Sequence, residues 1–129
     1  TATTLCAVTK DKEYLGGIIT PGINLSMAAL ESQTARLPTV EIVRPVGVLG
    51  RSTVESIQSG LYYGTLAMLR TLAVSVTAEH FINEQPLIIG TGGFGRLFEE
   101  EHLFDEFVPE LPLLGLQRAI KLSQTETRR

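Results

Sequence analysis

Aspartate is scarce in this chain: only Asp11 and Asp105 occur in 129 residues. Three segments nonetheless have the small and hydroxyl side chains that suit a phosphate or a nucleotide, namely residues 1–4, 50–60 and 90–95. Phosphoryl transfer usually requires carboxylates that hold a metal ion and orient the attacking hydroxyl. Because neither aspartate lies near these segments in the sequence, we interpret the chain as one half of a phosphoryl-transfer site.

The sequence also lacks a second cysteine, a long apolar run and a signal peptide, and each absence excludes a class of protein. Cys6 is the single cysteine, so no internal disulfide is possible, and its apolar neighbours predict a small buried residue in a strand. No apolar run approaches the about 20 residues that cross a bilayer, and the polar start lacks the basic region of a signal peptide. We therefore expect neither export nor a membrane anchor, and a reducing cytoplasm as the location.

The composition favours an ordinary globular domain, with 43% hydrophobic and 19% charged residues. A net charge of -3 and scattered basic residues argue against a nucleic-acid partner, which needs clustered cations. His80 and His102 have no second histidine or cysteine at metal-ligand spacing, so we expect no zinc site and place both on the surface. The sequence also has no nucleophile motif for covalent catalysis.

The first third of the chain predicts a hairpin and a helix. Two β-rich runs, residues 3–9 and 14–20, flank a charged turn. The glycines and proline of residues 16–22 predict either a bulge in the second strand or a close approach by another chain or a ligand. Asn24 is expected to cap a helix that ends near Arg36.

The longest predicted helix begins at residue 52. Ser52 and Glu55 have the spacing of a capping box, in which each side chain bonds the backbone of the other. Apolar residues then recur every three or four positions from Val54 to Val76, with Thr65 as a member of the stripe. Gly60 and Gly64 lie beside the stripe and predict tight packing against another element.

The last third predicts a short buried strand at residues 87–89, a glycine-rich turn, a helix at 96–101, and an edge strand or apolar patch near 104–108. A final helix should follow Pro112, with a face made by Leu113, Leu116, Gln117 and Ile120. We expect one domain over residues 1–122 and a frayed polar tail over 123–129.

Two candidate binding features keep a structural alternative. The pattern Gly90-x-Gly92-x-x-Gly95 matches a dinucleotide fingerprint, but the acidic residue expected about 20 positions later is missing. We interpret it instead either as a turn that lets a nucleotide approach the backbone or as a purely structural turn. Thr53, in the first turn of the long helix, is either a ligand contact or a solvated residue.

Five motifs in the same order resemble the C-terminal half of type III pantothenate kinases, and the resemblance spans nearly the whole chain. The residues that carry it are Thr1-Ala2-Thr3-Thr4, Tyr14 to Gly22, Ala35-Arg36-Leu37-Pro38, Gly50 to Gly60, and Thr91-Gly92-Gly93. The block from Gly50 to Gly60 is the most specific of them.

The resemblance implies a fold, an activity and partners. The fold would be α/β, a mixed sheet with flanking helices, as in an RNase H-like lobe of the actin, hexokinase and Hsp70-like superfamily. The complete enzyme would phosphorylate pantothenate with ATP in the first step of coenzyme A synthesis. It would work as a homodimer that needs Mg²⁺ and a monovalent cation, K⁺ or NH₄⁺.

The resemblance also implies roles for those residues of this chain that match the family's motifs. Thr1 matches a threonine that contacts ATP, and Thr53 one that contacts pantothenate. The segment Thr91-Gly92-Gly93 matches the part of the family's site near the adenine. Residues of the family's dimer-interface motif correspond to Gly16, Gly17, Pro21 and Gly22.

The departures from the family pattern concern acidic residues. The chain lacks the N-terminal phosphate loop, the Gly-x-Asp-Arg element with the general base, and the Asp-x-Gly that would stand just before Thr1. We therefore expect no catalytic residue and no metal ligand in this chain, and no activity from it alone. A non-catalytic regulator with this fold, or a lobe of another small-molecule kinase of the superfamily, are the alternatives.

Overall fold

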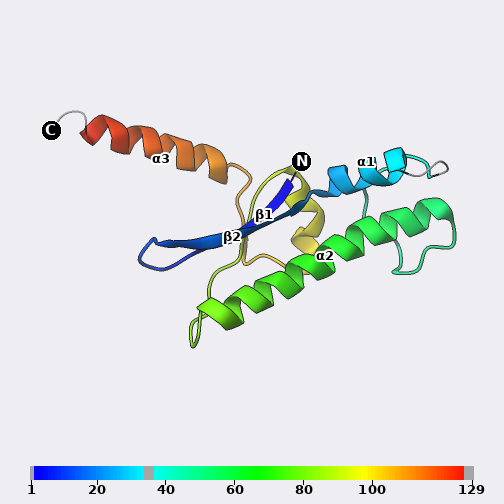
Figure 1. The fold of residues 1–129 in the computed structure, drawn as a ribbon, viewed down its shortest axis with the longest axis horizontal. Helices are drawn as coiled ribbons and strands as arrows, with labels where there is room; N and C mark the ends of the chain where they lie inside the picture. Colours follow the sequence, from blue (N-terminus) through cyan, green and yellow to red (C-terminus); the bar gives the residue numbers. More distant parts are fainter. Residues whose placement is uncertain (1, 34–36, 127–129) are drawn as a thin grey trace. The chain divides into compact units, whose positions relative to one another are not determined.

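A computed structural model describes residues 2–33 and 37–126. The chain divides into two compact units, Thr1–Glu84 and Gln85–Arg129. The chain contains both strands and helices, so it is a mixed α/β protein (Figure 1). Among the described residues, none of the helices combines the length and the apolar character that crossing a bilayer requires.

The first unit opens with the predicted antiparallel hairpin, made of β1 (Ala2–Val8) and β2 (Tyr14–Pro21). Side chains along β1 alternate between exposed and half-buried positions. Cys6 lies on the exposed side, so the expectation of a buried cysteine is wrong. Its apolar neighbours misled the prediction because adjacent residues of a strand point to opposite faces.

Two glycines shape β2. Gly16 has a φ of +141°, a conformation that favours glycine, and the strand register shifts between Ala7 and Val8. At Gly17, a Cβ atom would lie 2.7 Å from both the Leu5 carbonyl oxygen and the Tyr14 hydroxyl. The expected bulge is confirmed, whereas the close contact at Gly17 comes from the hairpin itself and not from another chain or a ligand.

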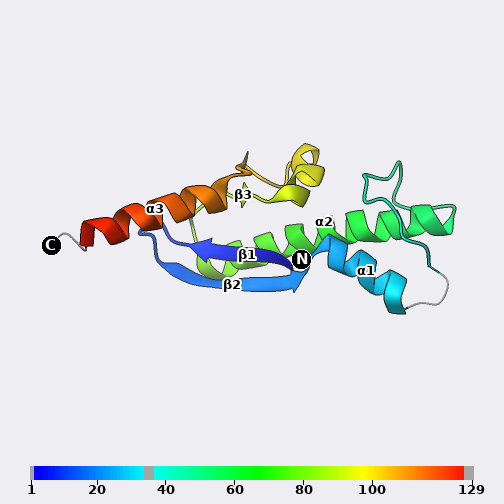
Figure 2. The same cartoon turned by 90° about the horizontal axis from the view of Figure 1, so that it is seen from above.

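Helix α1 (Ile23–Gln33) follows β2 and lies beside helix α2 (Thr53–His80) in both views (Figures 1 and 2). It begins before Asn24, so the predicted cap at Asn24 is wrong. Its first turn is closed by a bond from the Ser26 N–H to the Gly22 carbonyl, which puts a glycine at the cap. The predicted end at Arg36 lies outside the described residues.

Residues 37–52 have no regular structure and return along the first turns of α2 (Figure 2). The Ser59 hydroxyl donates to the Val48 carbonyl, and the Gln58 amide donates to the Glu41 carbonyl at 3.0 Å. Val40 is buried. Two polar side chains of the helix thus hold the loop that delivers the chain to the helix start.

The predicted capping box at the start of α2 is confirmed with one change. The Ser52 hydroxyl accepts a bond from the Glu55 N–H at 3.2 Å. The Glu55 carboxylate reaches back to the Arg51 N–H at 2.6 Å rather than to the amide of Ser52. The Ser52 side chain thus satisfies one backbone donor of the first turn, and the Glu55 side chain holds the residue before the cap.

The predicted stripe along α2 is confirmed in part. Ile57 and Leu61 are buried, whereas Val54 is exposed. The other buried apolar residues are Tyr62, Leu66 and Leu69, each of which follows a predicted stripe residue by one position in the sequence. These buried residues belong to the core of the first unit, which also contains Ile23, Met27 and Val40.

The second unit contains β3 (Ile89–Gly90), the 3-10 helix η1 (Gly93–Glu101), β4 (Glu106–Phe107) and α3 (Leu111–Glu126). Strands β3 and β4 pair in parallel. The prediction of a buried strand over 87–89 is wrong, because Leu87 and Ile89 are 74% and 45% exposed. Only β4 pairs with this run in the described part of the unit, so much of the run stays uncovered.

Helices η1 and α3 differ from their predictions in extent. Helix η1 begins at Gly93, earlier than the expected residue 96, and buries Phe98. Helix α3 has the predicted apolar face, but Leu113, Leu116 and Ile120 remain exposed and no described residue covers them. It runs to Glu126 and so includes part of the segment 123–129 that was expected to be a tail. The predicted boundary between domain and tail at residue 122 stays a prediction.

Gly50 offers a direct test of the junction between the loop and α2. A Cβ atom at Gly50 would lie 2.5 Å from the Glu55 carbonyl carbon and closer still to the Ser56 amide nitrogen. Both are backbone atoms of the helix start, which cannot rotate away. We predict that Gly50→Ala lowers the free energy of unfolding by more than about 1 kcal/mol in urea titrations.

Gly47→Ala is the matched control, because a Cβ atom there would meet no atom within 4 Å. It should change the stability by less than about 0.5 kcal/mol or raise it slightly. Equal destabilisation by the two variants would contradict the proposed clash.

Candidate functional site

The first candidate position is Thr53, at the start of α2. Its neighbour Ser52 caps the helix, so the Thr53 hydroxyl is not needed to bind the backbone of the first turn. The residue is exposed. At this position the first amides of a 28-residue helix point outward and favour a negative or strongly polar group. The exposed hydroxyl of Thr53 can donate or accept a hydrogen bond but has no ionisable chemistry of its own.

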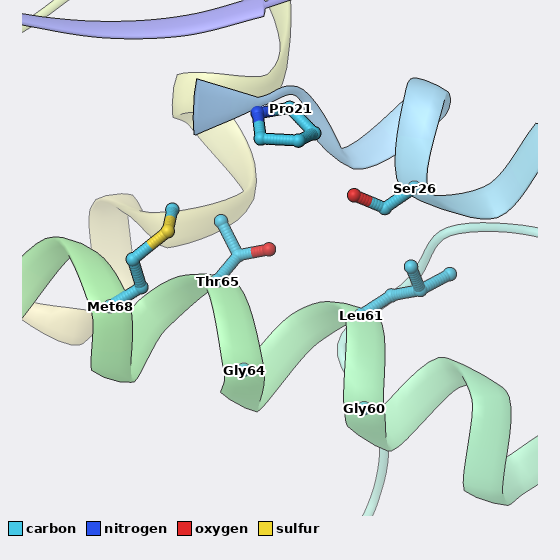
Figure 3. Close-up of a pocket in the computed structure, with 7 residues that line it drawn as sticks. All are labelled: Pro21, Ser26, Gly60, Leu61, Gly64, Thr65 and Met68. Atoms are coloured by element: carbon cyan, nitrogen blue, oxygen red, sulfur yellow. The ribbon is translucent and has the colours of Figure 1, made fainter. Parts of the chain in front are cut away.

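A second feature is an open hollow of about 210 Å³ between the end of β2, α1 and α2 (Figure 3). It lies wholly within the first unit. Its walls include Pro21, Ser26, Gly60, Gly64, Thr65 and Met68. In Figure 3 the Ser26 and Thr65 side chains stand at its sides with their hydroxyl groups, and Met68 supplies an apolar wall. No lining residue is ionisable, so the hollow can bind but cannot donate or remove a proton.

The hollow corrects the prediction for Gly60 and Gly64. Both glycines are exposed, and a Cβ atom at either would meet no other element within 4 Å. Tight packing was expected because glycine costs stability inside a helix. In the described structure the two glycines instead form the floor of the hollow, and their missing side chains keep it open.

Two of the four predicted interface residues lie at or next to this hollow. Pro21 is exposed and lines it, and the adjacent Gly22 is buried under the start of α1. Gly16 and Gly17 lie further along β2 and have the backbone constraints given above. The sequence missed Ser26 and Met68 as lining residues. Thr65 gave a usable signal, because it is the one hydroxyl in a stripe that is otherwise apolar.

The glycine-rich turn of the second unit divides into a packed part and an open part. A Cβ atom at Gly90 would strike the Phe104 ring, and one at Gly95 would strike the Phe107 ring. These two glycines therefore have a structural role. Gly92 has a φ of +88° and, like Gly93, is exposed with open space where a Cβ would be.

Thr91 is also exposed, and its hydroxyl donates to the Pro109 carbonyl at 3.3 Å. The backbone of residues 91–93 is thus accessible to a ligand, while the flanking glycines hold the turn in shape. Thr1, the other predicted contact to ATP, lies outside the described residues.

Neither aspartate stands at a candidate position. Asp11 is exposed in the hairpin turn. The Asp105 carboxylate accepts the Ile88 N–H at 2.7 Å, and its own N–H donates to the Ile88 carbonyl at 2.8 Å. Asp105 therefore fixes the pairing beside β3 and β4. Among residues 2–33 and 37–126, no group of three His, Cys, Asp or Glu side chains is placed to hold a metal ion.

The hairpin contains one perturbed side chain. The charge on Cys6 raises the pKa of Tyr14 above its ordinary value of 10.0, and a hydrogen bond between the two side chains acts in the same direction. The effect follows from the register, which brings Cys6 opposite Gly17, where no side chain separates the thiol from the Tyr14 hydroxyl.

We predict that Cys6→Ala lowers the pKa of Tyr14 toward 10, because the variant removes the neighbouring negative charge. The pKa of Tyr14 is measured by following its ring-carbon resonance by NMR from pH 8 to pH 12. The contribution of this pair to stability is present below the unfolded pKa and is lost as the pH rises through the folded pKa. An unchanged Tyr14 titration in Cys6→Ala would show that the thiol is not the cause, and Cys6→Ser serves as the isosteric control.

Comparison with known proteins shows where the chain belongs. Residues 1–75 match the family described as type III pantothenate kinase. The chain is 49% identical over 123 residues to a type III pantothenate kinase of Legionella pneumophila (strain Paris), an alignment that covers 95% of this chain and 48% of the relative. It is 45% identical over 117 residues to type III pantothenate kinase 1 of Francisella tularensis subsp. holarctica (strain LVS), covering 91% and 46%.

A type III pantothenate kinase of Elusimicrobium minutum (strain Pei191) is 42% identical over 125 residues, covering 97% of this chain and 48% of the relative. The chain thus spans about half the length of these curated relatives. The family match covers more than half of the chain, and each of these relatives is more than 40% identical to it along nearly all of its length. The chain belongs to the type III pantothenate kinase family.

Proposed function

We propose that the chain is the C-terminal half of an enzyme that transfers the γ-phosphate of ATP to pantothenate, the first step of coenzyme A synthesis. The observation that carries the proposal is the Legionella alignment, which covers 95% of this chain but 48% of a protein named as this kinase. In fold terms the chain is the C-terminal RNase H-like lobe of an actin- and hexokinase-like kinase.

The candidate residues supply recognition in this proposal. Thr53 contacts pantothenate through its free hydroxyl at the start of α2. Residues Thr91, Gly92 and Gly93 lie near the adenine, where a turn without large side chains admits a flat ring. Thr1 contacts the ATP phosphates. The segment Gly16 to Gly22 forms a homodimer interface, and the neighbouring hollow extends that surface.

The chemistry follows from what these groups can do. Hydroxyl and amide donors can bind and orient the pantothenate hydroxyl in line with the γ-phosphate, which is the main requirement of phosphoryl transfer. They cannot accept the hydroxyl proton at neutral pH, and Asp105 is engaged with the backbone of Ile88. The general base therefore comes from the part of the enzyme outside residues 1–129.

Magnesium and a monovalent cation, K⁺ or NH₄⁺, are expected with ATP on the basis of the family. Among the described residues, no group of three His, Cys, Asp or Glu side chains is placed to hold a metal ion. In this proposal the ligands of both cations lie outside residues 1–129. The enzyme is expected to work in the cytoplasm.

The proposal is tested by joining residues 1–129 to the half of the Legionella kinase that the alignment does not cover. The joined protein should phosphorylate pantothenate in a coupled ADP assay. A folded but inactive joined protein would favour the alternative of a non-catalytic regulator.

In the joined protein we predict that Thr53→Ala raises the KM for pantothenate about tenfold, the loss of one hydrogen bond. The KM for ATP should change less than about twofold, since the hydroxyl is assigned to the other substrate. Thr53→Ser retains the hydroxyl and should restore most of the affinity. Equal effects on both substrates would refute the assignment.

A further inference from the structure

Ser59 is an unusual residue for the buried side of α2. It is 6% exposed and stands in the sequence between the buried residues Ile57 and Leu61. A buried hydroxyl costs free energy unless it has a hydrogen-bond partner, and a serine inside a helix often finds that partner in the carbonyl four residues earlier. The Ser59 hydroxyl instead donates to the Val48 carbonyl, eleven residues earlier and outside the helix. A polar group in the core therefore holds the loop that precedes α2.

The segment held in this way, residues 48–52, is the one that leads into Thr53. Gly50 lies against the first turn of α2, because a Cβ atom there would come within 2.5 Å of the Glu55 carbonyl carbon. The Glu55 carboxylate accepts a bond from the Arg51 N–H at 2.6 Å. Together with the serine bond, these contacts attach segment 48–52 to the helix at its beginning, in its middle and near its end.

Thr53 depends on this segment because it lies in the first turn of α2. The first four N–H groups of a helix have no partner inside the helix, so the first turn depends on the residues before it. If segment 48–52 leaves its place for part of the time, the Thr53 hydroxyl is in position for only the remaining fraction. The apparent affinity for a ligand of Thr53 then falls in proportion to that fraction.

The adjacent residue, Gln58, makes a similar bond at a different place in the loop. Its side-chain amide donates to the Glu41 carbonyl at 3.0 Å. Eleven residues separate Glu41 from Thr53, whereas four separate Val48 from Thr53. A displacement at Glu41 can therefore be absorbed by the irregular loop before the helix begins, and a displacement at Val48 cannot.

We infer that Ser59 is a positioning residue for the substrate contact. Its hydroxyl fixes the Val48 carbonyl, and segment 48–52 then holds Thr53 where it meets pantothenate. This inference rests on the proposed function, in which Thr53 contacts pantothenate. It adds to that function a buried residue that acts on the substrate only through Thr53.

The kinetics of the joined protein test the inference. Ser59→Ala should raise the KM for pantothenate about fivefold, the loss of one hydrogen bond between uncharged groups. The KM for ATP and kcat should each change less than about twofold, because the affected group serves the binding of pantothenate. Ser59→Thr retains the hydroxyl and should bring the KM for pantothenate back to within about twofold of the unsubstituted value. An unchanged KM for pantothenate in Ser59→Ala would overturn the inference.

Gln58→Ala is the matched control, because it removes a bond between the same loop and the same helix. It should lower the melting temperature about as much as Ser59→Ala does and leave the KM for pantothenate within about twofold. An equal rise of this KM in both variants would indicate a general loss of loop structure and would refute a specific role for Ser59.

A double variant separates positioning from stability. If Ser59 acts through Thr53, Ser59→Ala combined with Thr53→Ala should have the same KM for pantothenate as Thr53→Ala alone. Multiplication of the two single effects would mean that Ser59 acts elsewhere, and the inference would fall.

The remaining outcomes are also decisive. If Ser59→Ala melts below the assay temperature, Ser59→Cys takes its place, because a thiol is a weaker donor. Its KM for pantothenate should rise by less than about fivefold but measurably, and an unchanged value would count against the inference. A joined protein that does not phosphorylate pantothenate would remove the proposed function together with this inference. Normal phosphorylation with an unchanged KM in the Ser59 variants would remove the inference alone.

Discussion

The first unit depends on the burial of one side of α2. Tyr62 has no exposed surface, and Leu66 and Leu69 continue the buried side along the helix. Burying these side chains is the main favourable contribution available to a unit of this size. The helix start is fixed by Ser52 and Glu55, and the same start presents Thr53 to solvent. The position of the candidate substrate contact is therefore a consequence of core packing.

In the proposed function, this chain contributes binding and the other half contributes proton transfer. The candidate positions of the chain offer hydroxyl groups, backbone amides and glycines, while its two aspartates lie in a turn and in a backbone contact. The scarcity of aspartate in the sequence and the backbone contact of Asp105 both support a general base outside this chain.

Local features could be predicted from the sequence because they depend on few neighbours. The hairpin, the capping box and the long helix follow from turn residues, a serine with a glutamate three positions on, and apolar spacing. Features that depend on distant packing were less predictable. Cys6 is exposed because no element of the first unit covers its face of the hairpin, and Gly60 and Gly64 line a hollow because no element of that unit packs against them.

The sequence identified which motifs belong to the candidate site, but it did not predict the contacts that each residue of these motifs makes. Thr53 and residues 91–93 are exposed as a binding role requires, yet their roles rest on the family resemblance. No sequence signal distinguished Gly90 and Gly95, which avoid phenylalanine rings, from Gly92, which needs its left-handed φ. That distinction requires the positions of Phe104 and Phe107, which come from the chain fold.

The central claim is that this chain recognises substrates while the catalytic carboxylate lies outside it. The most direct measurement is the turnover of purified residues 1–129 alone, with saturating pantothenate, ATP, Mg²⁺ and K⁺. We predict no phosphopantothenate above the level of a protein-free control. Sustained turnover by the isolated chain would contradict it and would require a general base among the residues described above.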